Sequence, residues 1–470
     1  MHVQGRTRVL AAGVVVAFGL SGCGGSVSTH PAAAGNRLRA SVSASADLLP
    51  IPQPDLSTLN RVTRQRLAPD SARIDLLLPP FSNSTGVTNA LFPIAALNAV
   101  ILGEVAGEPL KIETTLLPET KVVTWHGRRI EALQSQFCAF LNGRITELAV
   151  DLYAQADDGS VWYLGEDVVD YQHGMAESTE GTWRVGLDGP PAMIMPGHPT
   201  VGNVYRTENI PGIAFEQVTV KRVGVTVAGP TGPVGGAMVG QELHQDEKAL
   251  EAKVFAPGYG EFFSGGGHDF EANALSVPAD ARPGPVPDAL KTLLDRTRDV
   301  VAAARSKRWT SAAASLDRAI AAWLAYQAGG APDRLASHLQ VALASLATAV
   351  DQRRQRSVAQ SALHVMDAVL DLELQHRSPS TVNKARLVLW SRQLALDARA
   401  RRAGAVHGDV TTIGWIRDRL DLDPAAGANI DDQIRYLRAI AEANEFRRAA
   451  TQARRLRDNV RAAALVGSTR

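Results

Sequence analysis

The chain has 470 residues, of which 45% are hydrophobic and 21% charged, so it is long enough for two or three folded cores. Only two residues, Cys23 and Cys138, are cysteines, which excludes a disulfide-rich scaffold and leaves stability to packed cores. The net charge of +1 conceals a division, because residues 1–284 carry 20 basic and 29 acidic side chains and residues 285–470 carry 29 and 19.

The first 22 residues have the layout of a secretion signal. Arg6 and Arg8 precede an uncharged apolar run, Val9–Leu20, which is too short to cross a bilayer as a helix. The sequence Leu20-Ser-Gly-Cys23 that follows resembles the lipobox of bacterial lipoproteins. This resemblance implies cleavage before Cys23, lipidation of its thiol, and a lipid-anchored protein of the cell envelope that faces the periplasm or the exterior. Nucleic acid is not an expected partner in that compartment.

Residues 23–87 are expected to form a tether behind the lipidated cysteine. The segment is rich in Ser, Ala and Pro, with prolines at 50, 52, 54, 79 and 80. Such sequences are extended or flexible and build no core of their own. A short helix within Leu56–Leu67 is compatible with the pattern.

Residues 88–263 have the pattern of an antiparallel β domain. Apolar runs alternate with the turn dipeptides Asn142-Gly143, Asp158-Gly159 and His173-Gly174, each of which favours a tight hairpin. Cys138 alternates with aromatic residues and is expected to be a buried strand thiol. Consecutive hairpins without intervening helices predict an all-β sandwich or a partly open barrel.

Several motifs of this segment resemble an uncharacterised secreted β-rich domain that recurs in bacterial lipoproteins. The motifs are Leu91-Phe-Pro93, Asp151–Asp167, Glu180–Trp183, Ile194-Met-Pro196, Val201–Arg206 and Ala256–Gly260. The resemblance covers about 170 residues and implies a fold and a location, but no activity.

Two groups of polar residues in the β segment resemble sites without meeting their requirements. The acidic and aromatic run from Trp162 to Tyr171 lacks the spacing of a calcium loop, and strand ends explain it more simply. Ser264, His268 and Asp269 lie too close together in sequence for a hydrolase triad. The glycines and prolines of residues 264–287 predict an interdomain linker between two independent cores.

Residues 288–465 return to helical spacing, with Trp309, Leu316, Ile320 and Trp323 on one face. Ser378-Pro379 has the layout of a helix start and Gly404 that of a helix end, and six to eight helices are expected in an up-and-down bundle. The run from Leu389 to Arg419 resembles helical domains of other exported bacterial proteins. The excess of arginine suits solvated helix faces, or an anionic partner such as lipid or cell-wall polymer.

One set of residues in the helical part is a candidate metal site. His364, Asp367 and Asp371 occur at i, i+3 and i+7, which places them on one helix face, and His338 and His376 are possible further ligands. A solvated stripe beside the core is the simpler interpretation. No catalytic residue and no cofactor is expected. The sequence thus favours a non-catalytic protein that binds an envelope component or a ligand, and the alternative is a metal-binding bundle with redox or hydrolytic activity.

Overall fold

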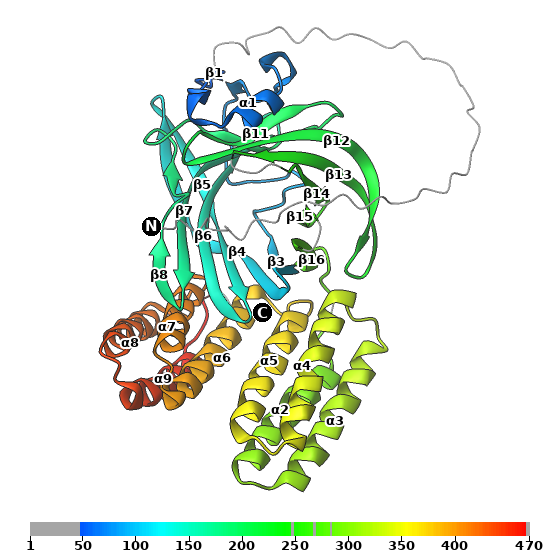
Figure 1. Ribbon diagram of the computed structural model, residues 1–470, viewed down its shortest axis with the longest axis vertical. Coiled ribbons are helices and arrows are strands. Elements are labelled where there is room, and N and C mark those ends of the chain that lie inside the picture. Colours follow the sequence, from blue (N-terminus) through cyan, green and yellow to red (C-terminus); the bar gives the residue numbers. More distant parts are fainter. Residues whose placement is uncertain (1–47, 246–248, 267–268, 283, 467–470) are drawn as a thin grey trace, which may run out of the picture.

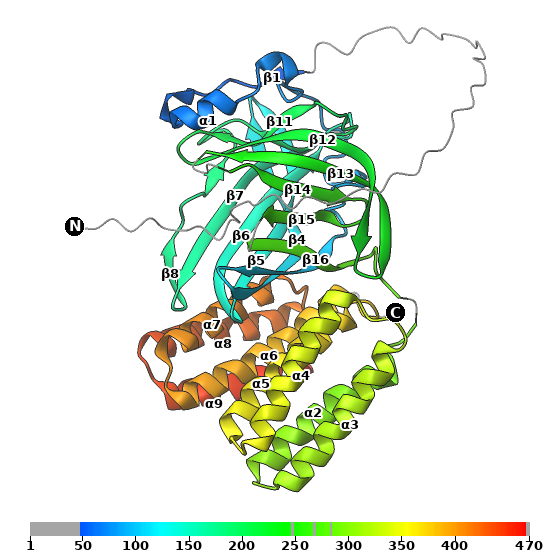
Figure 2. The same cartoon turned by 45° about the vertical axis from the view of Figure 1, so that its right-hand side comes forward.

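The structure is a computed structural model that describes residues 48–245, 249–266, 269–282 and 284–466. In this part of the chain an antiparallel sheet of 14 strands precedes eight helices, α2–α9 (Figures 1 and 2). The succession of an antiparallel β part and a helical part confirms the predicted fold class. Cys23 and the signal segment lie outside the described residues.

The strands of the sheet follow the order β10-β7-β6-β5-β4-β3-β16-β15-β14-β13-β12-β11, with β8 and β9 both paired to β7. Their bounds are β3 Asn98–Val105, β4 Glu108–Trp125, β5 Arg128–Leu141, β6 Arg144–Gln155, β7 Val161–Gln172, β8 Met175–Ser178, β9 Trp183–Arg184, β10 Ala192–Met195, β11 Val204–Ile210, β12 Ala214–Gly229, β13 Gly232–His244, β14 Glu251–Ala256, β15 Gly260–Gly266 and β16 Asp269–Val277. Because β3 pairs with both β4 and β16, one continuous sheet joins the first and last strands.

The sheet curls so that its two halves face each other across a common core (Figure 2). That core includes Tyr163 of β7, Tyr205 of β11 and Phe255 of β14. The path of paired strands ends at β10 and β11, so the sheet is not closed. Of the two predicted architectures, the structure is therefore the partly open one.

The predicted hairpins form at the expected dipeptides. Asn142 and Gly143 have φ values of 50° and 68° between β5 and β6, and His173 and Gly174 have 52° and 80° between β7 and β8. Two successive positive φ values are typical of the type I′ turn, whose twist matches that of the strands. Cys138 on β5 is completely buried, as predicted.

The helical part consists of two groups of four helices that lie side by side beneath one end of the sheet (Figures 1 and 2). Their bounds are α2 Asp288–Arg305, α3 Trp309–Gln327, α4 Asp333–Asp351, α5 Gln355–Glu373, α6 Pro379–Ala400, α7 Ala403–Asp418, α8 Pro424–Glu442 and α9 Phe446–Ala462. Each group has an apolar cluster, and Val382 and Leu389 of α6 belong to the cluster of α2–α5. Eight helices among the described residues agree with the predicted six to eight.

Helix starts were predicted better than helix ends. Ser378 caps α6 by accepting a hydrogen bond from the Thr381 amide, as its position before Pro379 predicts. The prediction that Gly404 ends a helix is wrong, because α6 ends at Ala400 and Gly404 lies inside α7. Gly404 instead allows close contact, since a Cβ atom there would lie 2.3 Å from the carbonyl oxygen of His173.

The predicted tether is folded where the structure describes it. Strands β1 (Leu49–Pro50) and β2 (Leu77–Leu78) pair with each other, and the short α1 (Arg61–Arg66) confirms the predicted helix. Two short 3-10 helices, η1 (Leu56–Thr58) and η2 (Asp70–Ala72), complete the segment. The buried Asp75 carboxylate accepts a hydrogen bond from the Arg206 amide at 2.9 Å, so this segment is attached to the sheet. The boundary of the tether at residue 87 is therefore wrong.

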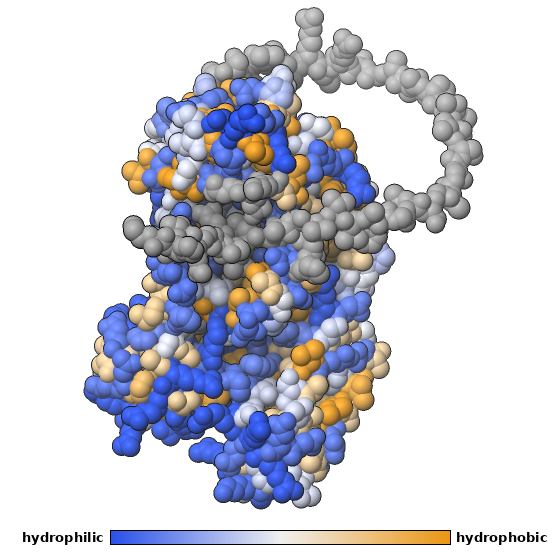
Figure 3. All heavy atoms as spheres, viewed as in Figure 1, coloured by the Kyte–Doolittle hydropathy of each residue, from blue (hydrophilic) through white to orange (hydrophobic). Residues whose placement is uncertain are grey.

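The predicted linker at residues 264–287 is also wrong, because it contains β16, which lies between β3 and β15 in the sheet. Val100 and Leu102 of β3 and Val277 of β16 share an apolar cluster with Leu290 and other residues of the helices. The sheet and the first helical group thus have a common core. On the face shown in Figure 3 the helical part is mostly hydrophilic, in keeping with solvated helix faces.

Candidate functional site

The candidate metal trio lies where α5 packs against β4. His364 is exposed, the Asp367 side chain is 26% exposed and Asp371 is fully buried, so the three do not form the solvated stripe that the helical pattern predicted. The helix face was identified correctly. The sheet covers this face of the helix, and the sequence of the helix alone does not indicate that contact.

Both aspartates are engaged by a lysine of the sheet. Lys111 Nζ lies 2.7 Å from Asp367 Oδ2, 2.9 Å from Asp371 Oδ2 and 3.1 Å from Glu113 Oε1. Lys111 and Glu113 share a face of β4 because strand residues two apart point the same way. The sheet thus supplies one cation and one carboxylate to a buried ion network.

Two arginines of the helical part complete the network. Arg386 of α6 lies 2.6 Å from Asp371 and 3.2 Å from Glu113, and Arg419, which follows α7, pairs with Glu113. Three cations therefore balance the carboxylates of Glu113, Asp367 and Asp371. Burial disfavours the charged form of Lys111, but the nearby aspartates outweigh this effect and raise its pKa.

The balance of charge bears on metal binding. Carboxylate oxygens of Glu113, Asp367 and Asp371 lie within 4.8 Å of one another, a spacing that a metal ion could use. A metal would have to displace Lys111 and Arg386 from fully buried contacts. The network has no excess negative charge to attract a cation, so its arrangement suits a connection between sheet and helices.

The three histidines of the candidate metal site, His364 of the trio and the possible further ligands His338 and His376, are divided between two places. The exposed His364 accepts a hydrogen bond from the Gln360 amide at 2.9 Å. His338 of α4 is close enough to the network for Lys111 to affect it, and burial lowers its pKa. His376 instead contacts the Tyr326 hydroxyl at 3.4 Å. The structure does not bring these three imidazoles together.

The polar groups singled out on the sheet have structural partners. Tyr163 donates a hydrogen bond to Asp151 and shares its hydroxyl with Glu166, both at 2.8 Å, and Trp162 is fully buried. Ser264 donates to Glu251. His268 lies outside the described residues.

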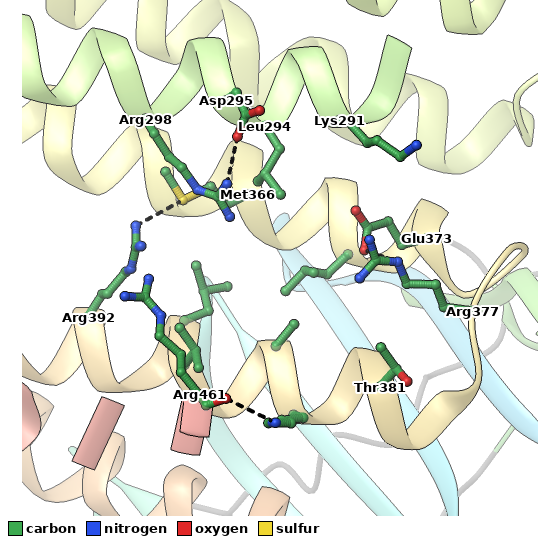
Figure 4. Close-up of a pocket in the computed structure, with 15 residues that line it drawn as sticks. Lys291, Leu294, Asp295, Arg298, Met366, Glu373, Arg377, Thr381, Arg392 and Arg461 are labelled. Carbon is green, nitrogen blue, oxygen red and sulfur yellow. Dashed lines mark hydrogen bonds and ion pairs between the residues drawn. The ribbon is translucent and has the colours of Figure 1, made fainter. Parts of the chain in front are cut away.

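A cavity of about 460 Å³ opens between the two helical groups, where α2 and α5 meet α6 and α9 (Figure 4). Such a volume is typical of small-molecule sites. Part of its wall is apolar, from Leu294, Met366, Leu370, Ala385, Val388 and Leu389. The remainder carries six basic and two acidic side chains, which are Lys291, Arg298, Arg377, Lys384, Arg392, Arg461, Asp295 and Glu373.

The positive charge is concentrated at one end of this pocket. Figure 4 shows the guanidinium groups of Arg392 and Arg461 close together, with Arg298 opposite them. Arg298 pairs with Asp295 at 2.8 Å, whereas Arg392 has only the Met366 sulfur at 3.8 Å as a partner among the described residues. Burial, and then repulsion by Arg461 and Arg298, lowers the pKa of Arg392 to about 10.

Sequence reasoning did not identify this pocket. The available signal is the excess of arginine after residue 285, which solvated helix faces also explain. Only the packing of α2 and α5 against α6 and α9 brings Arg298, Arg392 and Arg461 together.

Among the described residues, no helix combines the length and apolar character needed to cross a membrane. Searches of protein-family models, curated proteins and solved structures for similarity to this chain found no match.

Proposed function

We propose that this protein is a lipid-anchored binding protein of the bacterial envelope whose helical part holds an anionic ligand with an apolar portion. The observation that carries the proposal is Arg392, a partly buried guanidinium without a carboxylate partner among the described residues. Arginine is the side chain best suited to bind carboxylate or phosphate through paired hydrogen bonds.

The composition of the pocket supports an amphipathic ligand. An anionic head would meet the guanidinium groups of Arg298, Arg392 and Arg461, and an apolar portion would contact side chains such as Leu370 and Val388. Carboxylate- and phosphate-headed lipids share this chemistry. Neither a nucleophile nor a pair of acids for catalysis is needed for such a role.

A binding assay can test the role of charge. A fluorescent fatty acid should bind the purified chain, and the fatty alcohol with the same fluorescent chain should bind much more weakly. Arg392→Gln should weaken fatty-acid binding at least about tenfold, because hydrogen bonds to charged groups contribute about 1.5–3 kcal/mol.

Arg296→Gln is the matched control for this assay. Arg296 lies on α2 but does not line the pocket, and it pairs with Asp299 at 2.7 Å. Its replacement should leave binding unchanged. Equal binding of the acid and the alcohol, or equal effects of the two variants, would contradict the proposal. Inorganic phosphate as a competitor distinguishes a site for the anion alone from one that also requires the chain.

The envelope location rests on Leu20-Ser-Gly-Cys23, which lies outside the described residues. Cys23→Ala should abolish the incorporation of labelled fatty acid in the bacterial host and leave an uncleaved precursor. Unchanged labelling in this variant would contradict the anchor without affecting the proposed pocket.

A further inference from the structure

A second group of ionisable side chains lies on the sheet, apart from the helical pocket. It comprises Glu216 of β12, Glu242 and His244 of β13, and Glu251 of β14. Glu216 pairs with His244 across one ladder, and Glu242 pairs with Glu251 across the next. Because Glu242 and His244 are two residues apart on a strand, all four side chains share one face.

The imidazole of His244 is surrounded by carboxylates. Its Nε2 lies 2.9 Å from Glu251 Oε2 and 3.5 Å from Glu242 Oε2, and its Nδ1 lies 2.8 Å from Glu216 Oε1. His244, Glu242 and Glu251 are each at most 5% exposed.

Hydroxyl groups orient two of these carboxylates. Ser264 donates a hydrogen bond to Glu251 Oε1, and the Thr207 hydroxyl is shared between Glu242 Oε1 at 3.3 Å and Glu216 Oε2 at 3.2 Å. In each carboxylate the other oxygen, Oε2, faces His244 Nε2, and Glu242 Oε2 also lies 3.0 Å from Lys253 Nζ, which a bound metal would displace. Three potential ligand atoms thus converge, and the hydroxyl donors come from other strands of the sheet, Ser264 from β15 and Thr207 from β11.

The site contains more acid than base. The cations are His244 and Lys253, whose Nζ lies 3.0 Å from Glu242 Oε2 and 3.6 Å from Glu261 Oε2. Four carboxyl groups, those of Glu216, Glu242, Glu251 and Glu261, lie against these two cations, so acidic groups outnumber basic ones.

An independent observation also indicates a missing ligand. Tyr205 is fully buried, and its hydroxyl has no hydrogen-bond partner among the described residues. Tyr205 pairs with Val218 of β12, which in turn pairs with Glu242 of β13, so the Tyr205 side chain lies on the same face of the sheet as the cluster. A bound ion or its water would supply the hydrogen-bond partner that this buried hydroxyl lacks.

We propose that this cluster is a transition-metal site of the zinc class, with His244 Nε2, Glu242 and Glu251 as protein ligands. One imidazole with carboxylates favours zinc over calcium, which takes six to eight oxygens. Glu216 accepts the Nδ1–H of His244, the carboxylate–histidine contact that orients metal-bound imidazoles. Binding releases the Nε2 proton of His244 to solvent, so the metal replaces a proton at that nitrogen.

The first experiment uses the untagged wild-type chain. After treatment with chelator and reloading with Zn²⁺, elemental analysis should find one equivalent retained through dialysis, and affinity should increase with pH as the proton is displaced. Co²⁺ should give the visible absorption of a four-coordinate ion. No retained Zn²⁺, retention of Ca²⁺ in its place, or a six-coordinate Co²⁺ spectrum would overturn the proposal. These measurements do not depend on the folding of any variant.

Substitutions then locate the ion. Glu251→Gln and His244→Gln should each weaken Zn²⁺ binding by about 100-fold or more, and Glu216→Gln should weaken it by about 10–100-fold as an outer partner. His376→Gln is the control, because it removes an imidazole from the helical part. Wild-type affinity in folded Glu251→Gln and His244→Gln proteins, or loss of binding in His376→Gln, would place the ion elsewhere.

Discussion

At the scale of single residues, Lys111 neutralises the acidic face of α5 through ion pairs with Asp367 and Asp371. Its ammonium contacts three carboxylates while its side chain is only 10% exposed. Removal of one partner from a buried ion pair leaves an uncompensated charge, and this is the costly case. Asp367 and Asp371 therefore have a structural role, because their ion pairs with Lys111 connect α5 to the sheet.

We expect Lys111→Met to lower the free energy of unfolding by about 3 kcal/mol or more, because buried carboxylates lose their shared counter-ion. Lys121→Met on the same strand is the control. Lys121 is 40% exposed and lies 3.8 Å from Asp167, so its loss should cost less than about 1 kcal/mol. Urea denaturation measures the free energy of unfolding of both variants. Similar losses in the two variants would contradict the proposed contribution of the ion network to stability.

At the scale of elements, the contact between α7 and the β7–β8 hairpin depends on the absence of side chains. Gly404 faces the carbonyl oxygen of His173, and the Cα atom of Gly174 lies against Gly408. Glycine within a helix normally weakens it by about 1 kcal/mol relative to alanine. Here close packing of two backbones explains its presence.

Gly404→Ala should therefore destabilise the protein by about 1–3 kcal/mol, the usual cost of overpacking, although alanine is the better helix former. The new Cβ would lie 2.3 Å from a backbone oxygen. A Cβ atom at Gly414 on the same helix would lie 2.7 Å from the flexible end of the Arg438 side chain and 4.0 Å from Ile434 Cγ2, so Gly414→Ala should be neutral or stabilising. Thermal melts compare the two variants. A stabilised Gly404→Ala variant would show that the β7–β8 hairpin shifts at little cost to accommodate the added Cβ atom.

Local patterns predicted the elements well because they depend on neighbouring residues. The dipeptide Asn142-Gly143 specifies its own turn, and Ser378-Pro379 specifies its own helix start. The ion network could not be predicted in this way, since Lys111 and Asp367 are 256 positions apart in sequence. The linker prediction was wrong because Gly265 and Gly266 belong to β15 and pair with Phe270 and Asp269 of β16, so these glycines lie within the sheet.

At the scale of the whole molecule, the sheet and helices should unfold together. Leu102 and Val277 share a cluster with α2–α5, and Arg144 of β6 pairs with Asp397 and Asp409 of the second helical group. Differential scanning calorimetry should give one transition with a ratio of calorimetric to van't Hoff enthalpy of about 1. Two resolved transitions would show that these contacts do not couple the two parts.

The dependence of stability on pH follows from the buried acids of the sheet. Burial raises the pKa of Asp151 to about 7, against hydrogen bonds from tyrosines, and Glu242 and Glu271 are raised to about 7 and about 8. An acid whose pKa is raised on folding binds its proton more tightly in the folded state than in the unfolded chain. Its contribution is present below the unfolded pKa near 4 and is lost as the pH rises through the folded value.

The contribution of Glu216 to stability depends on pH in the opposite direction, because the attraction of His244 outweighs burial and lowers the pKa of Glu216 to about 2. Its contribution is present above the unfolded pKa and is lost as the pH falls through the folded value. The metal-free protein should therefore be most stable near pH 4.5–5 and should lose stability towards pH 8. The contribution of Asp151 to this loss is at most about 4 kcal/mol, at about 1.4 kcal/mol per pKa unit.

Urea denaturation in the presence of chelator, from pH 4.5 to pH 8.5, measures this profile, and Asp151→Asn identifies one contribution to it. Asparagine retains an acceptor for the Tyr163 hydroxyl but carries no charge. This variant should gain stability relative to the wild type as the pH rises through 7, and its profile should be flatter. An unchanged slope would mean that Asp151 ionises in the folded protein as readily as in the unfolded chain.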